Sequence, residues 1–128
     1  GVISPEVHLG RDSLVGIAYV LEMMAERKKS VSELVSSLPA YVMKKGKIEL
    51  SAATNNASML DKIAKEFSRE KISRLDGLRI DFRTATPMKG GWVHLRPSNT
   101  EPIFRIIAEG KTNEHAELIY KEFYKRLS

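Results

Sequence analysis

Residues 92–109 read WVHLRPSNTEPIFRIIAE and hold two apolar segments on either side of a polar one. The segments Trp92–Arg96 and Ile103–Glu109 are rich in the β-branched and aromatic residues typical of strands. Residues 97–102 begin and end with proline and contain Ser, Asn and Thr, which favour a turn or loop. This stretch therefore predicts two strands joined by a polar loop.

Three more strands are expected upstream of this pair. Ile72–Leu75 and Leu78–Phe82 flank Asp76-Gly77, a dipeptide that strongly favours a hairpin turn. Tyr41–Leu50 also has the composition of a strand, although its KKGK segment at 44–47 indicates either a bulge or an edge position.

Two amphipathic helices complete this part of the chain. One is expected over residues 55–70, and its apolar face carries Met59, Leu60, Ile63 and Phe67. The other is expected over Asn113–Leu127, with Asn113 as its N-cap. The order β-α-β-β-β-β-α predicts an α+β domain, in which two helices cover one face of a four- to five-stranded antiparallel sheet.

The N-terminal part predicts a loop over residues 1–10 and then two helices. Asp12 or Ser13 can cap the first helix, whose apolar stripe repeats at three- and four-residue spacing: Leu14, Ile17, Leu21 and Met24. The segment SVSE at 30–33 is a capping box that opens a second, shorter helix. The first helix needs a partner for its stripe, so we expect it to pack on the C-terminal domain, to form an oligomer or to be poorly ordered.

A domain boundary or hinge is expected at residues 36–40, SSLPA, because Pro39 ends the second helix. The charge balance changes at the same point. Residues 1–38 carry four basic and five acidic side chains, whereas residues 39–128 carry seventeen basic and eleven acidic ones. Such an excess attracts anions, from phosphate esters to nucleic acids. A lysine-rich solubilising surface is the simpler interpretation of the charge alone.

The overall composition excludes several classes of protein. The 128 residues have a net charge of +5, are 42% hydrophobic and include no cysteine. That hydrophobic share can fill a core, so the chain is not a disordered tail. No apolar run approaches the ~20 residues needed to cross a bilayer. Disulfides, cysteine zinc sites and thiol nucleophiles are excluded, and with no visible signal peptide we expect a cytoplasmic location.

The loop at 97–102 and its borders are the candidate anion site. The guanidinium of Arg96 matches a phosphate in a bidentate fashion, and Arg105 can add a second positive charge. The candidate ligands are Arg96, Ser98, Asn99, Thr100 and Arg105. Backbone N–H groups from 98 to 101 can form an anion nest, while Glu101 is expected to pair with an arginine or brace the loop. An ordinary surface turn would contain most of the same residues, so both interpretations stay open.

The run WVHLRPSNTEPIFRIIAEG at 92–110 resembles the C-terminal phosphate-binding loop of the α-D-phosphohexomutases. This family includes phosphoglucomutase, phosphomannomutase and phosphoglucosamine mutase. Its loop typically reads Arg-x-Ser-(Gly/Asn)-Thr-Glu-Pro, followed by an arginine-bearing strand and an acidic residue. All these elements are present: Arg96, Ser98, Asn99, Thr100, Glu101, Pro102, Arg105 and Glu109. The run GVISPEVHLGRDSLVGIAYVLEMMAE at 1–26 resembles the segment after the family's sugar-recognition loop.

This resemblance implies a parent enzyme of four domains that interconverts hexose 1-phosphates and hexose 6-phosphates. A phosphoserine of the first domain exchanges its phosphoryl group with the sugar through a bisphosphate intermediate. The second domain holds Mg²⁺, the third reads the sugar hydroxyls, and the fourth grips the phosphate that is not transferred. By the resemblance, residues 1–38 are the tail of the third domain and residues 39–128 are the fourth.

The family's phosphoserine, metal and sugar loops have no counterpart in this sequence. We therefore expect a fragment with no catalytic residue and no metal ligand, inactive alone, whose parent enzyme binds Mg²⁺ elsewhere. The expected partners are a hexose phosphate and the remaining domains of the parent chain, without a membrane.

A basic nucleic-acid-binding module is the main alternative, and a free-standing phosphate-binding or interaction domain is another. The predicted sheet lacks the interleaved aromatic residues that stack bases, which makes nucleic acid the weaker choice. Trp92 precedes the polar loop and is expected to belong to the core. The three histidines lie far apart and do not have the spacing of a metal site.

Overall fold

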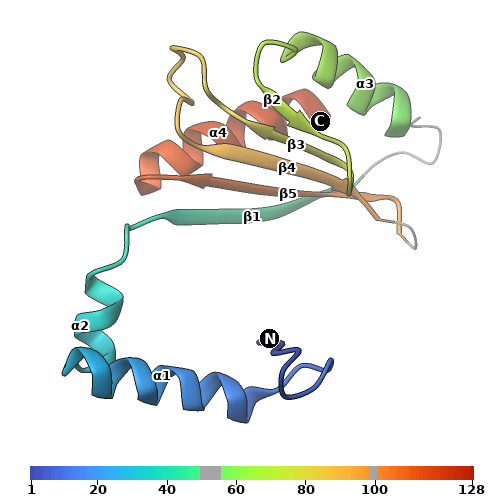
Figure 1. Ribbon diagram of the computed structural model, residues 1–128. Coiled ribbons are helices and arrows are strands. Elements are labelled where there is room, and N and C mark those ends of the chain that lie inside the picture. The colour runs from blue at the N-terminus through green and yellow to red at the C-terminus, as the bar shows by residue number, and fades with distance from the viewer. Residues whose placement is uncertain (50–55, 99–100) are drawn as a thin grey trace. The chain divides into compact units, whose positions relative to one another are not determined.

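The structure is a computed structural model that describes residues 1–49, 56–98 and 101–128 (Figure 1). The chain divides into two units, Gly1–Pro39 and Ala40–Ser128. Each unit has its own secondary structure.

The first unit consists of α1 (Ser13–Arg27) and α2 (Val31–Ser36) after an irregular N-terminal segment. Asp12 caps α1, because its Oδ1 accepts hydrogen bonds from the N–H groups of Leu14 and Val15 at 2.8 and 3.1 Å. The capping box at the start of α2 is confirmed, with Ser30 and Glu33 each bonded to the other's backbone N–H. Within the first unit no residue of α1 is buried, and Leu14, Ile17 and Leu21 of its apolar stripe are exposed there.

The second unit is a five-stranded sheet with two helices, as the sequence pattern predicts. Its strands are β1 (Val42–Glu49), β2 (Lys71–Ser73), β3 (Leu78–Asp81), β4 (Trp92–Pro97) and β5 (Ile103–Gly110). They lie in the order β1-β5-β4-β3-β2, and all neighbours are antiparallel. The helices are α3 (Asn56–Glu66) and α4 (Asn113–Leu127), and both lie on one face of the sheet (Figure 1).

The core of this unit lies between that face and the two helices. Alternate residues of the strands enter it, as the two-residue period of a strand requires. Phe104, Ile106 and Leu95 are fully buried and meet Ile63 of α3 and Phe123 of α4 in one cluster. The rings of Phe67, Phe82 and Phe123 also touch one another, with centroids 5.2 to 6.0 Å apart. A continuous core of this kind fixes the register of every strand.

The predicted bulge in the KKGK segment is wrong, but the predicted edge is correct. β1 pairs with β5 residue by residue from Val42 to Glu49, and β1 is the edge strand. Gly46 faces α4, and a Cβ there would overlap the hydroxyl of Tyr120. The glycine therefore admits the helix, rather than breaking the strand.

Two other local predictions are corrected. The N-cap of α4 is Thr112 and not Asn113, because the Thr112 hydroxyl accepts a hydrogen bond from the N–H of His115 at 3.2 Å. Trp92 is not a core residue. It lies on the face of the sheet opposite the helices, while its neighbour Val93 is fully buried. Both residues are apolar, so alternation alone did not say which of them points inward.

Candidate functional site

The β4–β5 hairpin places two arginines directly opposite one another. Arg96 and Arg105 are partners in the antiparallel register, next to the polar loop that joins the strands. Side chains at such a position have Cβ atoms about 5 Å apart, and like charges there repel. The core on the other face of the sheet fixes the register of β4 and β5, and this register keeps the two exposed guanidinium groups close together.

Hydrogen bonds within the loop brace its described residues. The N–H of Ser98 donates to the carbonyl of Ile103 at 2.9 Å, which closes the hairpin. The N–H of Glu101 donates to the Ser98 hydroxyl at 3.3 Å. The predicted anion nest is therefore wrong for Ser98, because its N–H is used inside the hairpin. Asn99 and Thr100, the other predicted ligands in the loop, lie outside the described residues.

A third segment meets the hairpin at Arg96. The Nε of Arg96 lies 3.1 Å from Oδ1 of Asp76, in the turn between β2 and β3. The Nε2 of His94 contacts the carbonyl oxygen of the same Asp76. An arginine held through Nε keeps further N–H groups on its terminal nitrogens, so it can orient towards a second anion.

Gly77 explains how this turn comes so close to β4. Its φ is +72°, a conformation that favours glycine, and a Cβ would overlap the carbonyl oxygen of Leu95. The Asp76-Gly77 dipeptide, predicted only as a hairpin signal, therefore also supplies the partner of Arg96. Nothing in the local pattern indicated this contact, because twenty positions separate Asp76 from Arg96.

A small concavity lies at this end of the hairpin. It has a volume of about 160 Å³ and is lined by Arg96, Pro97, Ser98 and Arg105. Three of these four residues belong to the predicted set of ligands. The geometry thus brings Arg96, Ser98 and Arg105 together around one small polar hollow.

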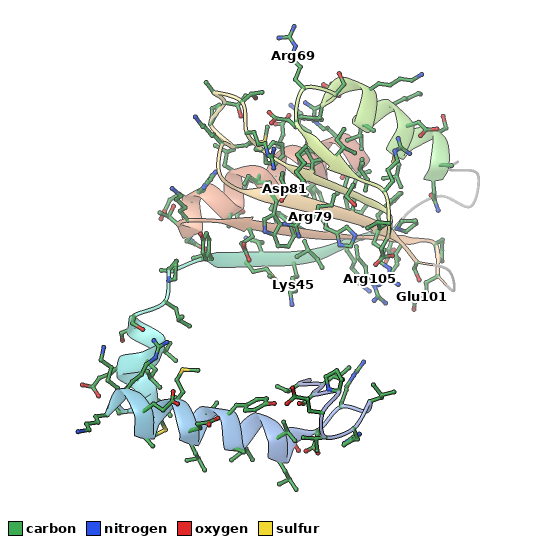
Figure 2. All side chains as sticks on the ribbon, in the orientation of Figure 1. Lys45, Arg69, Arg79, Asp81, Glu101 and Arg105 are labelled. Carbon is green, nitrogen blue, oxygen red and sulfur yellow. The ribbon has the colours of Figure 1, made fainter. Side chains whose placement is uncertain are left out.

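The sheet face opposite the helices, here called the open face, carries the rest of the local charge. Its charged and polar residues are Lys45, Lys47, Glu49, Lys71, Ser73, Arg79, Asp81, Trp92, His94, Arg96, Arg105 and Glu109. Figure 2 shows Lys45 and Arg105 on the side of the sheet away from α3 and α4. The open face is therefore mainly basic around the concavity.

A polar cluster that the sequence did not predict occupies the middle of the open face. The guanidinium of Arg79 lies 4.1 Å from the ring centroid of Trp92, and the indole N–H donates to Glu109 at 2.8 Å. Arg79 also donates to Asp81 at 2.8 Å, and this hydrogen bond lowers the pKa of that carboxyl group. These contacts cover Trp92 with charged side chains, so its ring is not a bare stacking surface.

The described residues contain no group of three His, Asp or Glu side chains that could hold a metal ion. These residues therefore offer no donor set that fits the Mg²⁺ implied by the family resemblance. Within the same residues, no helix is both long and apolar enough to span a membrane.

A larger concavity, about 680 Å³, lies in the first unit against α1. Its lining is mostly apolar, with Ile17, Leu21 and Met24 among the residues that contribute. An apolar hollow of this kind suits packing better than recognition of a charged ligand. The smaller, basic concavity on the hairpin is therefore the better candidate for a functional site.

Comparison with known proteins agrees with the sequence resemblance. A family model described as "Phosphoglucomutase/phosphomannomutase, C-terminal domain" matches residues 43–126. A "Probable phosphoglucosamine mutase" from Pyrococcus horikoshii is 38% identical over 123 residues, which is 94% of this chain and 26% of that protein. A "Phosphoglucomutase/phosphomannomutase" from Thermococcus kodakarensis is 36% identical, over 91% of this chain and 24% of that protein. A "Phosphoglucosamine mutase" from Methanococcus maripaludis is 31% identical, over 93% and 26% respectively. The chain thus spans about a quarter of the length of these curated relatives.

Proposed function

Because this chain belongs to the family of phosphoglucomutase/phosphomannomutase C-terminal domains, we propose that it is the phosphate-gripping domain of a phosphohexomutase. The observation that carries the proposal is the concavity between the opposed residues Arg96 and Arg105. Such a site holds the phosphate of a hexose phosphate that is not being transferred. Residues 1–38 are then the tail of the domain that reads the sugar.

The proposed site would bind phosphate through the fixed arrangement and the positive charge of its donor groups. A phosphate dianion requires donors in a fixed arrangement, and arginine offers a planar set that matches its oxygens. Arg96 is oriented by Asp76, and Arg105 is supported by the strand opposite. The hydroxyl of Ser98 and the side chains of Asn99 and Thr100 are proposed as neutral donors. Binding energy gained at a group remote from the reaction can orient the reacting end of the substrate.

Such a site recognises phosphate and not the sugar attached to it. A mutase must accept the two ends of a hexose bisphosphate in turn, so the gripping site has to tolerate both orientations. Two arginines beside a small polar hollow support this role, because they match a phosphate regardless of the ring behind it. The names of the relatives point to glucosamine, glucose and mannose phosphates as the substrates to test.

The chemical step is proposed to depend on other domains of a parent enzyme. In that enzyme a phosphoserine and a bound Mg²⁺ would carry out the transfer, and this chain would only hold and orient the substrate. We therefore expect no turnover of glucosamine 1-phosphate by this chain alone, even with a hexose bisphosphate supplied. Turnover above the rate without protein would contradict this part of the proposal.

The test is the affinity of this chain for glucosamine 6-phosphate, measured by calorimetry at low ionic strength. Arg96→Ala should abolish measurable binding, because it removes the guanidinium that lines the concavity. Arg69→Ala is the matched control, since Figure 2 shows Arg69 pointing away from the sheet at the far side of the domain. The control variant loses the same charge and should bind like the unmodified chain. Equal affinities for all three proteins would exclude this site.

Single-stranded RNA is the competing ligand to test on the same proteins. Among the described strand residues, the aromatic rings on the open face are Trp92, whose ring lies beside the guanidinium of Arg79, and His94, whose Nε2 contacts the carbonyl oxygen of Asp76. This arrangement does not favour stacking of bases. Tight RNA binding that weakens steeply with salt, without any response to hexose phosphate, would overturn the mutase proposal.

A further inference from the structure

Three cations form a row across the sheet beside the concavity. Lys47 of β1 is the register partner of Arg105 of β5, and Arg105 is the partner of Arg96 of β4. Neighbouring strands lie about 4.8 Å apart, so the row extends roughly 10 Å. All three side chains are on the open face and exposed.

The neighbouring rows of the open face do not place cations directly beside one another. The neighbouring row contains Lys45, Ile107, His94 and Arg79, where an apolar residue separates the charges. The row after that contains Met43, Glu109, Trp92, Asp81 and Lys71, so acidic and basic groups alternate there. On the other side, the row nearest the polar loop contains Glu49 and Ile103. Among the described strand residues, Lys47, Arg105 and Arg96 therefore form the row of the open face in which cations stand next to one another without an apolar or acidic residue between them.

Among the described residues, Arg96 is the one member of this row that forms an ion pair with an acidic side chain. Asp76 pairs with Arg96. Within residues 1–49, 56–98 and 101–128, no acidic side chain forms an ion pair with Lys47 or Arg105, although Glu49 follows on the same face of β1. Like charges at directly opposed positions destabilise a sheet, so Lys47 beside Arg105 costs the free protein some stability. An anion held between them would remove that cost.

We propose that Lys47 is a third phosphate-binding cation, extending the anion site from the β4–β5 hairpin onto the edge strand β1. This inference rests on the proposed phosphate-gripping function, and it adds Lys47 to the residues that bind the phosphate. The phosphate lies at Arg96 and Arg105, and the ammonium group of Lys47 reaches it across β5 on a flexible four-carbon stem. The attraction between Lys47 and the phosphate then depends on the charge of the phosphate and not on its orientation, because an ammonium group acts as a point charge.

The other lysines of β1 provide matched controls. Lys45 is on the same face of the same strand, but its partner is Ile107 and it lies one row further from the loop. Lys44 points to the helix side and pairs with Glu117. Neutralising either of them removes the same formal charge from β1, without removing a member of the row.

The experiment measures the dissociation constant of inorganic phosphate for this chain at low ionic strength. Lys47→Gln should weaken binding about fivefold, the order expected for one solvated charge acting on a dianion. Lys45→Gln and Lys44→Gln should change it by less than about twofold. Lys47→Arg keeps the charge and should restore binding. Thermal unfolding of the free proteins provides a second readout: Lys47→Gln should raise the melting temperature, because it relieves the repulsion with Arg105.

The outcomes separate this inference from the function on which it rests. If Arg96→Ala abolishes phosphate binding while Lys47→Gln leaves it unchanged, the hairpin site stands and the role of Lys47 is refuted. If Lys47→Gln and Lys45→Gln weaken binding equally, only net charge matters, and the role of Lys47 is again refuted. If Arg96→Ala itself leaves binding unchanged, the proposed function fails first.

Discussion

The Nε of Arg96 lies 3.1 Å from Oδ1 of Asp76, so the guanidinium that lines the concavity is already held by a carboxylate of another turn. Both side chains are about half exposed, and an isolated surface pair of this kind contributes little to stability. Its effect is instead to orient Arg96. In the proposed site the same carboxylate would also repel a phosphate, so it would both position the arginine and weaken the binding.

Replacement of Asp76 separates these two effects. Asp76→Asn keeps an oxygen that can accept from Arg96 but removes the negative charge, so phosphate should bind about three times more tightly at low ionic strength. Asp76→Ala removes the charge and the acceptor, so its affinity should be lower than that of the asparagine variant. Calorimetric titration with inorganic phosphate measures the order. Weaker binding by Asp76→Asn than by Asp76→Ala would show that orientation through this oxygen has no role.

Gly77 is predicted to be the least replaceable residue of that turn. A side chain at Gly77 would be strained at a φ of +72° and would overlap the Leu95 carbonyl. Gly77→Ala should therefore lower the free energy of unfolding by about 2 to 4 kcal/mol. Gly90→Ala is the control, because Gly90 also has a positive φ but an added Cβ would have only Lys111 near it, at 3.7 Å. It should lose only about 1 kcal/mol. Urea unfolding that gives equal losses would mean that the contact with Leu95 is absent.

Asp81 should make the stability of the domain dependent on acid pH. The Arg79 hydrogen bond lowers the pKa of Asp81 in the folded state, so its contribution is present above the unfolded pKa of about 3.9. The contribution is lost as pH falls through the lower, folded pKa. Asp81→Asn should therefore flatten the decrease in unfolding free energy between about pH 5 and pH 2.

Fluorescence of Trp92, the only tryptophan, follows this unfolding directly, because Arg79 lies over its ring. Arg79→Gln should flatten the acid dependence as Asp81→Asn does, and the double variant should add little to either. Additive effects of the two substitutions would show that the pair does not act as a unit.

Phe123 should be a main contributor to stability, since it is fully buried against Phe67 and Phe82. Phe123→Ala should cost about 3 to 5 kcal/mol of unfolding free energy, the range for a large aromatic residue in a core. Tyr124, the next residue, is 44% exposed, and Tyr124→Ala should cost about 1 kcal/mol or less. Chemical denaturation of the two variants measures the contrast. Similar losses would mean that α4 packs with a different face towards the sheet.

The secondary structure of this domain could be predicted because each element carries its own local signal. The strands of the β4–β5 hairpin differ from their proline-bounded loop in composition, and the Asp76-Gly77 turn has a standard hairpin sequence. The helices have an apolar stripe of the correct period. The predictions were wrong where two neighbouring residues suit the same position, either the inward-facing position of a strand or the N-cap of a helix. Trp92 and Val93 are both apolar, and Thr112 and Asn113 are both good caps.

The candidate site was only partly predictable, because its members come from distant parts of the chain. Arg96, Ser98 and Arg105 are close in sequence, so their grouping followed from the motif. Asp76 and Lys47 are brought beside them by strand order and register, which no local pattern specifies. Sequence alone also could not show that the Ser98 N–H is used to close the hairpin.

Chemical-shift mapping of this chain with glucosamine 6-phosphate tests the central claim most directly. The proposal predicts saturable shifts concentrated on the backbone signals of Arg96, Ser98 and Arg105 and on the guanidinium signal of Arg96. The signals of α3 and Arg69, on the helix side and beyond it, should not move. Shifts centred away from the β4–β5 hairpin, or no shifts at millimolar ligand, would contradict the claim that this domain grips a sugar phosphate there.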